Sequence, residues 1–294
     1  MSAVIAMVRR EYLEHRAAFV IAPAILLGLA LLGALYGTIS VSTSGRFAAE
    51  LPSLLIFYET LFAAAAYGWS VYLLVMLAFY FANAFSADSR NNAMLFWKSV
   101  PQSDLTIMGA KVLTGLTVFP LAILLATGIS GIIAYLPAFS VGSALSEFAP
   151  PDPGQAALAW VQIMVIACVY FAVGLLWYLP FLCWIGFLST IFARWAMPLA
   201  VLIPMVGALI EFMATGGAGP RGGYLLAFLR DRLSLDIEGL DMEMRWLSGE
   251  AFQAGPMVTR ILGGVDWLSL GVGLGVAAVL VFLASEYRRR YILS

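Results

Sequence analysis

The residues best suited to chemistry in this chain lie between positions 86 and 111, in the segment SADSRNNAMLFWKSVPQSDLTIMGAK. It holds both lysines of the chain, Lys98 and Lys111, and lies between two long apolar runs. Residues 92–100 can form about two helical turns, which Pro101 ends because proline lacks a backbone donor and disfavours helix in the residue before it. Ser103 then fits the N-cap of the next helix. These residue types suit recognition more than catalysis. Such a helix can rest on lipid head groups or fit a groove on a soluble partner, and the alternative is a solvated connector.

The chain lacks the motifs with which enzymes hold phosphates or activate nucleophiles. There is no GxxxxGK[ST] loop, no HExxH and no nucleophile elbow, and the single histidine, His15, cannot form a metal site alone. The centres of the apolar runs are nearly free of ionisable residues, whereas secondary transporters and proton-coupled pumps bury such groups at mid-membrane. We therefore expect no catalytic, cofactor-binding or metal-binding residues, and a driving force received through segment 86–111.

Composition and apolar runs indicate how these residues are positioned. The 294 residues are 62% hydrophobic and 11% charged, which is typical of a polytopic membrane protein, and a net charge of −1 argues against nucleic acid as a partner. Runs long enough to cross about 30 Å of hydrocarbon predict six spans. They lie at about 17–39, 61–85, 107–136, 157–178 with 192 as an alternative end past Pro180, 196–213 and 265–285. We expect a single all-α transmembrane domain over residues 1–294.

Positive residues set the expected orientation. Cytoplasmic loops of membrane proteins carry an excess of lysine and arginine. With both termini cytoplasmic, the inner side holds most of the 16 basic residues, namely Arg9, Arg10, Arg16, Arg90, Lys98, Lys111, Arg194 and the run at 288–290. Residues 1–16 are then expected to form an interfacial amphipathic helix with Ile5, Val8 and Tyr12 on its apolar stripe.

Outside segment 86–111, four residues are candidates for a role. Gly33 and Gly37 have the GxxxG spacing that lets helices approach closely, so they are candidates for dimer packing. Glu59 and Glu211 fall near the outer ends of their predicted spans, where a carboxylate reaches water, and each is a candidate for a substrate path. Residues 214–264 are expected to be an external loop with one amphipathic helix at 224–233.

The segment FSADSRNNAMLFWKSVPQSDLTIMGAK resembles the cytoplasmic loop of ATP-binding-cassette (ABC) type-2 transporter permeases, the ABC-2 type family. In that family a pattern like D-R-x-x-x-x-L-F-W-K-S-L-P-x-S-D precedes a lysine that opens the third span. Asp88 and Arg90 are one residue further apart than the family's adjacent pair. Residues 176–211 are similar to the family's fourth-to-fifth-span region, and residues 9–23 resemble its interfacial helix.

The resemblance implies a six-span permease subunit of an ATP-driven exporter in the inner or plasma membrane of a bacterium. It implies a homodimer, or a pair with a paralogous permease, that binds two copies of a separate ATPase subunit carrying ATP and Mg. A coupling helix between spans two and three would sit in a groove of that ATPase. The contact candidates carried over from the family are Asp88, Arg90, Met94, Leu95, Phe96, Trp97, Lys98 and Pro101.

Two other functions remain open from the residues alone. One is a non-transport membrane scaffold that recruits a cytoplasmic partner through segment 86–111. The other is an intramembrane lipid-modifying enzyme built from scattered serines and carboxylates. For a transporter, the sequence leaves the substrate open among lipids, peptides, antibiotics, ions and glycans.

Overall fold

The computed structural model describes residues 3–44, 53–90, 103–144, 150–217, 223–233 and 252–292, and within these ranges every regular element is a helix. In chain order the elements are α1 (Ala3–Arg16), the π-helical η1 (Ala17–Ile21), α2 (Ala22–Ser44), α3 (Leu54–Arg90), α5 (Asp104–Leu116), α6 (Val118–Ala144), α7 (Pro153–Phe192), the 3-10 turn η3 (Ala193–Trp195), α8 (Ala196–Thr215), α9 (Tyr224–Leu233), α11 (Ala254–Gly264), α12 (Trp267–Tyr287) and the π-helical η5 (Arg288–Ile292).

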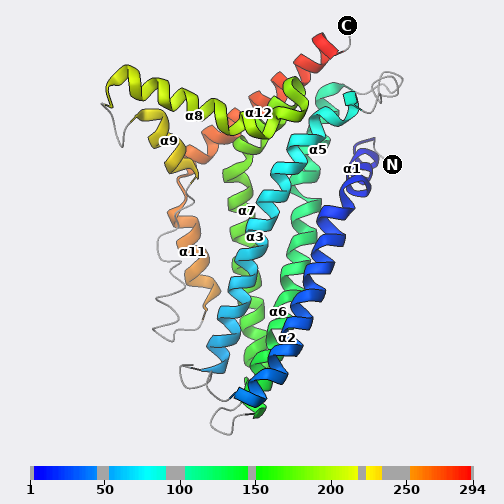
Figure 1. Ribbon diagram of the computed structural model, residues 1–294, viewed down its shortest axis with the longest axis vertical. Coiled ribbons are helices and arrows are strands. Elements are labelled where there is room, and N and C mark those ends of the chain that lie inside the picture. The colour runs from blue at the N-terminus through cyan, green and yellow to red at the C-terminus, as the bar shows by residue number, and fades with distance from the viewer. Residues whose placement is uncertain are drawn as a thin grey trace.

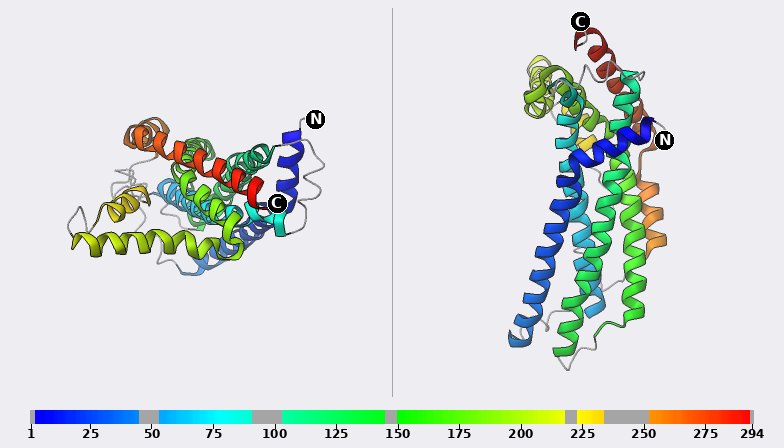
Figure 2. Two further views of the ribbon diagram at one scale, coloured as in Figure 1. Left: turned by 90° about the horizontal axis from the view of Figure 1, so that it is seen from above. Right: turned by 90° about the vertical axis from the view of Figure 1, so that its right-hand side faces the viewer.

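Four long helices, α2, α3, α6 and α7, stand side by side and form the body of the molecule (Figure 1). Both termini lie at the same end of this bundle, and α1 bends away from the direction of α2 there (Figures 1 and 2). The oblique helix α12 packs on α7 and ends beside α5. That shared end therefore gathers the two ends of the chain and the start of α5.

Five helical segments are long and apolar enough to cross a membrane: Val4–Thr38, Leu54–Ala87, Asp104–Ser143, Pro153–Thr215 and Trp267–Arg290. For the described residues, these segments confirm the expectation of an all-α protein with helices long and apolar enough to span a membrane. The count of six spans is not confirmed. Residues 196–215 do form a helix, α8, but it runs across the end of the bundle instead of back along it (Figures 1 and 2).

The change of direction between α7 and α8 has a local cause. Ala193 has a φ of +39°, a value that side-chain-bearing residues seldom adopt, and it ends α7 at once. The 3-10 turn that follows re-aims the chain, and the indole Nε1 of Trp184 donates to the carbonyl of Ala200 at 3.3 Å. Helix α8 therefore stays near the end that holds the termini (Figure 1), whereas the six-span expectation had this segment cross to the opposite end.

The bundle is held by interlocking apolar side chains along the full length of α3. Toward the end with the termini, Leu77 and Phe81 pack with Ile123 of α6 and Cys183 of α7. Toward the other end, Phe62 packs against α6, α7 and α11 in a second cluster. Lipid tails are as apolar as leucine, so helix association in a membrane depends on such close packing and on hydrogen bonds more than on the hydrophobic effect.

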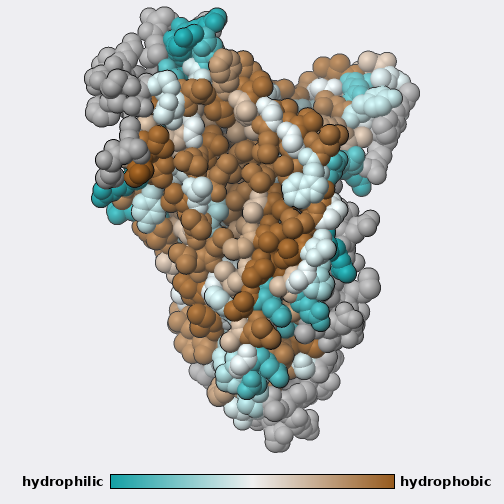
Figure 3. Space-filling view, turned by 180° about the vertical axis from the view of Figure 1, so that it is seen from behind, coloured by the Kyte–Doolittle hydropathy of each residue, from teal (hydrophilic) through white to brown (hydrophobic). Residues whose placement is uncertain are grey.

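The outer surface of the bundle is apolar as well. Large side chains such as Leu32, Leu125 and Leu268 are mostly exposed, at 63%, 70% and 79%. Figure 3 shows one face of the molecule, where apolar residues cover most of the body and hydrophilic residues gather toward its ends. A soluble protein seldom exposes so much contiguous apolar surface. This distribution fits a bundle surrounded by lipid.

Candidate functional site

Segment 86–111 is described at its two edges. Helix α3 ends at Arg90 and α5 begins at Asp104, both at the end of the bundle that holds the termini. The central coupling-helix candidates, Met94, Leu95, Phe96, Trp97, Lys98 and Pro101, lie outside the described residues, as do the side chains of Asp88 and Arg90. Their contact with a partner stays a prediction.

The start of α5 is capped as the sequence predicts. The hydroxyl of Ser103 accepts a hydrogen bond from the backbone N–H of Thr106 at 3.2 Å, so Ser103 is the N-cap. Asp104 follows in the first turn, where the helix dipole favours a negative charge. Its Oδ1 also lies 2.9 Å from Nε of Arg288, which is only 2% exposed. The C-terminal end of the described chain is thereby paired with the first residue of α5.

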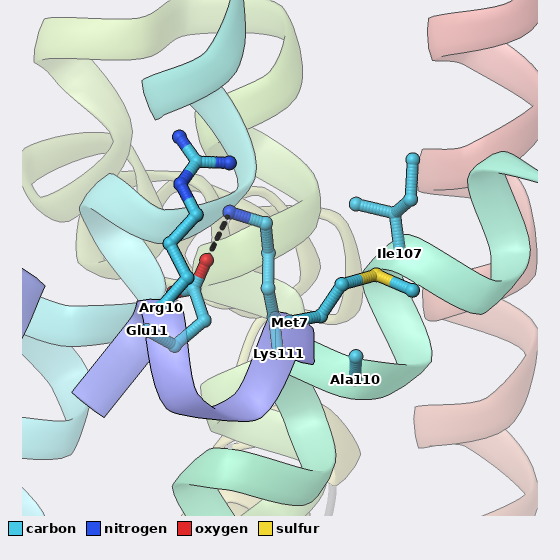
Figure 4. Close-up of a pocket in the computed structure, with 6 residues that line it drawn as sticks. All are labelled: Met7, Arg10, Glu11, Ile107, Ala110 and Lys111. Atoms are coloured by element: carbon cyan, nitrogen blue, oxygen red, sulfur yellow. Dashed lines mark hydrogen bonds and ion pairs between the residues drawn. The ribbon is translucent and has the colours of Figure 1, made fainter. Parts of the chain in front are cut away.

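About two helical turns further along α5, a second ion pair joins it to the N-terminal helix. Nζ of Lys111 lies 2.9 Å from Oε1 of Glu11 in α1, and the two residues are 3% and 4% exposed (Figure 4). Figure 4 shows Glu11, Met7 and Arg10 of α1 facing Ile107, Ala110 and Lys111 of α5 around a small pocket. The apolar contact of Met7 with Ile107 and Ala110 shields the pair from water.

Tyr80 of α3 completes this cluster. Its hydroxyl lies 3.1 Å from Oε2 of Glu11 and 3.0 Å from the carbonyl oxygen of Lys111. The ring of His15 meets the ring of Tyr80 edge-on at 4.8 Å, and Nδ1 of His15 lies 3.1 Å from the carbonyl oxygen of Glu11. We call Glu11, His15, Tyr80 and Lys111 the junction cluster. It links α1, α3 and α5 through charges and dipoles that water does not screen.

The bend between α1 and α2 is built into the same region. The π-helical turn η1 carries Phe19, which is 1% exposed and stacks on Phe119 with ring centroids 3.8 Å apart. A π-helical turn shifts the backbone hydrogen bonds by one residue. The hydroxyl of Tyr72 donates to the carbonyl of Ala18 at 2.5 Å, so a side chain of α3 supports this irregular turn. The angle at which α1 reaches α5 is therefore fixed by packing on α3 and α6.

The arrangement joins helices through buried charges. Breaking a buried ion pair leaves an uncompensated charge in a low-dielectric site, which costs about 3–5 kcal/mol. Helix α5 is thus fastened to α1 by Lys111 and to the end of α12 by Asp104. Through the carbonyl of Lys111, α5 is also bonded to Tyr80 of α3. Within the described ranges, no three His, Cys, Asp or Glu side chains gather as a metal site would require.

The other candidates from the sequence lie apart from this cluster. A methyl group added at Gly33 or Gly37 would meet nothing within 4 Å, so both glycines lie on an open face of α2. Glu59 does not reach water: it is 2% exposed, and its Oε2 accepts a hydrogen bond from the backbone N–H of Phe252 at 3.0 Å. A dimer contact and a role in a substrate path stay predictions for these residues.

Glu211 has a structural task in α8. Its two carboxylate oxygens accept hydrogen bonds from the backbone N–H groups of Tyr224 and Leu225, each at 2.8 Å. These are orphan donors of the first turn of α9. Glu211 therefore caps a helix from a distance in sequence and joins α8 to α9. The helix at Tyr224–Leu233 itself is confirmed.

Sequence reasoning missed most of the junction cluster. It placed the apolar stripe of the N-terminal helix on Ile5, Val8 and Tyr12, yet Ile5 is 54% exposed while Met7 and Glu11 are buried. A detectable signal was present in Lys111, a lone cation entering an apolar run, because such a charge needs a partner from another segment. Nothing local singled out Glu11, since it lies among several charged residues of α1.

Comparison with known proteins gave no match: no family model, no curated protein and no solved structure matches the chain. The class that the structure itself defines is an all-helical, multi-pass membrane protein, by the length and composition of five helical segments.

Proposed function

We propose that this chain is the permease subunit of an ATP-driven exporter of the ABC-2 type, coupled to a separate ATPase through segment 86–111. The observation that carries the proposal is that segment: its sequence resembles the family's coupling loop, and its two described edges meet the termini at one end of the bundle. By the same resemblance the chain works as a six-span dimer in a bacterial inner or plasma membrane. The distribution of lysine and arginine favours cytoplasmic termini.

The distribution of charge supports an external source of energy. There is no charged residue from 60 to 87, from 112 to 146 or from 153 to 193. An ion-driven transporter couples its substrate to ionisable groups near the middle of the bilayer, and these stretches offer none. Without a phosphate-binding loop of its own, the chain would need an ATPase partner to supply free energy.

The junction cluster, together with the pair of Asp104 and Arg288, is the proposed route by which that energy would enter the bundle. A push on residues 91–102 acts directly on Asp104, the first residue of α5. The two ion pairs of α5 carry the displacement to α1 through Lys111 and to the C-terminal end of α12 through Arg288. Because α1 continues through η1 into α2, the first and third apolar segments then move together. Alternating access by rigid-body motion needs such stiff joints between helices.

The test is copurification with a candidate ATPase followed by measurement of ATP hydrolysis. The intact chain should bring down the ATPase, and the complex should hydrolyse ATP while the chain alone does not. Trp97→Ala should reduce copurification at least tenfold, because buried tryptophans dominate interface energies. Trp267→Ala is the matched control, since Trp267 is 57% exposed at the start of α12, away from the termini. Recovery of a partner without ATPase motifs would favour the scaffold instead.

A further inference from the structure

Helix α9 carries a buried cation that the proposed function does not use. Arg232 is 6% exposed, and within the described part of the molecule its Nη1 and Nη2 have no hydrogen-bond partner. Its guanidinium carbon lies 4.0 Å from the ring centroid of Trp177 in α7. Arginine keeps its proton at neutral pH, so this is a permanent charge with two of its donor nitrogens unsatisfied.

The surroundings fix the guanidinium and leave its need for an anion unmet. The indole Nε1 of Trp177 donates to the carbonyl of Arg232 itself at 2.8 Å, so the aromatic platform and the arginine backbone hold each other in place. Burial lowers the pKa of Arg232, and the charge of Asp266 opposes that shift. Asp266 is not an ion-pair partner, however. Both of its oxygens cap α12, accepting from the backbone of Leu268 and Ser269 and from the Ser269 hydroxyl.

A cation stacked on an aromatic face gains attraction from the ring, but the donors in its plane still lack acceptors. A buried donor left unsatisfied destabilises the fold, and a charged one does so more strongly. The planar fork of an arginine matches a phosphate or carboxylate, which accepts two parallel hydrogen bonds. The missing partner is therefore an oxyanion.

The outer face of α9 indicates where that oxyanion comes from. Tyr224 and Phe228, one turn apart on one side of this ten-residue helix, are 68% and 61% exposed. Leu226, on the opposite side beside the exposed Arg230, is 48% exposed. A short helix with an apolar outer face and arginines is typical of one lying at a membrane interface. Phospholipid head groups are the oxyanions present at such a surface.

We propose that Arg232, on its Trp177 platform, is a binding site for the phosphate of an anionic phospholipid. Nη2 rests in a notch above Gly273 of α12, where a methyl group on that residue would collide with it. The hydrogen bonds that place α9 come from α7, through Trp177 and Tyr178, and from α8, through Glu211. All of these bonds go to the backbone of α9, so the position of the helix does not depend on what Nη1 and Nη2 of Arg232 bind.

This inference does not rest on transport or on an ATPase, so it is tested on the isolated full chain. Native mass spectrometry of the protein in neutral detergent would follow binding of phosphatidylglycerol, phosphatidylcholine and glycerol phosphate. The wild type should retain phosphatidylglycerol more tightly than phosphatidylcholine. Arg232→Gln should weaken phosphatidylglycerol binding about tenfold or more, given the strength of hydrogen bonds to charged groups. Arg230→Gln, on the same helix, is the matched control and should bind like the wild type.

One further variant keeps the proposal falsifiable. Arg232→Lys keeps the charge without the planar fork and should bind at an intermediate level. If neither Arg232 variant is recovered as a monodisperse protein, the test uses the wild type alone. Phosphatidylglycerol should then raise its melting temperature above the value in phosphatidylcholine, and equal melting temperatures overturn the proposed site.

The other outcomes are equally definite. Equal phosphatidylglycerol binding by Arg232→Gln and the wild type overturns the proposal. Binding of glycerol phosphate that also depends on Arg232 supports recognition of the phosphate group. Arg232-dependent binding of glycerol phosphate, with none of phosphatidylglycerol, overturns the lipid as the occupant.

Discussion

Removing the charge of Lys111 is expected to destabilise the protein by about 3–5 kcal/mol, the usual cost of breaking a buried ion pair from one side. In Lys111→Met the unbranched apolar body is kept and the side chain is shorter by one atom, so little packing is lost. The carboxylate of Glu11 stays behind at 4% exposure and keeps the Tyr80 hydroxyl at 3.1 Å and Nδ1 of His15 at 3.9 Å as neighbours. Glu11→Gln should cost a similar amount, because it removes the carboxylate that lies 2.9 Å from the buried ammonium group.

The assay is equilibrium unfolding of the full chain in mixed micelles, read out as the free energy of unfolding. The double variant Glu11→Gln with Lys111→Met should cost at least about 2 kcal/mol less than the sum of the single variants, because coupled residues are not additive. Glu14→Gln is the control on the same helix. Its carboxylate lies 4.0 Å from Nε of Arg10 with both side chains more than a third exposed, so we expect less than about 1 kcal/mol. Additive losses below 1 kcal/mol for Glu11 and Lys111 would refute the junction cluster.

Three more predictions concern other parts of the fold. Arg288→Gln strands Asp104, which is 19% exposed on its side chain, so the free energy of unfolding should fall by about 2 kcal/mol, less than for Lys111. Gly131→Ala places a methyl group 2.6 and 2.7 Å from two aromatic rings and should cost about 1–3 kcal/mol, whereas Gly33→Ala, with open space around it, should not destabilise the monomer. Hydrogen bonds from the following serine hold the pKa of Asp266 below its usual range. Its contribution to stability is therefore present above about pH 4 and is lost as pH falls through the lower folded value, so the melting temperatures of wild type and Asp266→Asn should converge in acid.

The sequence was sufficient for the features that depend on local chemistry. Long apolar runs predicted the membrane-spanning helices, and Ser103 predicted its own cap because the N-cap hydrogen bond reaches only three residues along the chain. The helix at Tyr224–Leu233 followed from its amphipathic pattern. None of these features needs knowledge of what lies far away in sequence.

Features that depend on contacts between distant segments could not be predicted from the sequence. The pair of Glu11 and Lys111 joins positions 100 residues apart, and helical periodicity does not say which charge on α1 turns inward. The path of α8 depends on one backbone torsion at Ala193, which hydropathy cannot report. An apolar helix of 20 residues has the composition of a span whether it runs along the bundle or across its end.

The most direct test of the central claim is a photo-crosslinker placed at Trp97 in the full chain in living cells. The account predicts one dominant crosslinked protein that carries a phosphate-binding loop and hydrolyses ATP, lost when the crosslinker is moved to Trp267. A crosslinked partner without that loop, or ATP hydrolysis by the purified chain alone, would contradict it.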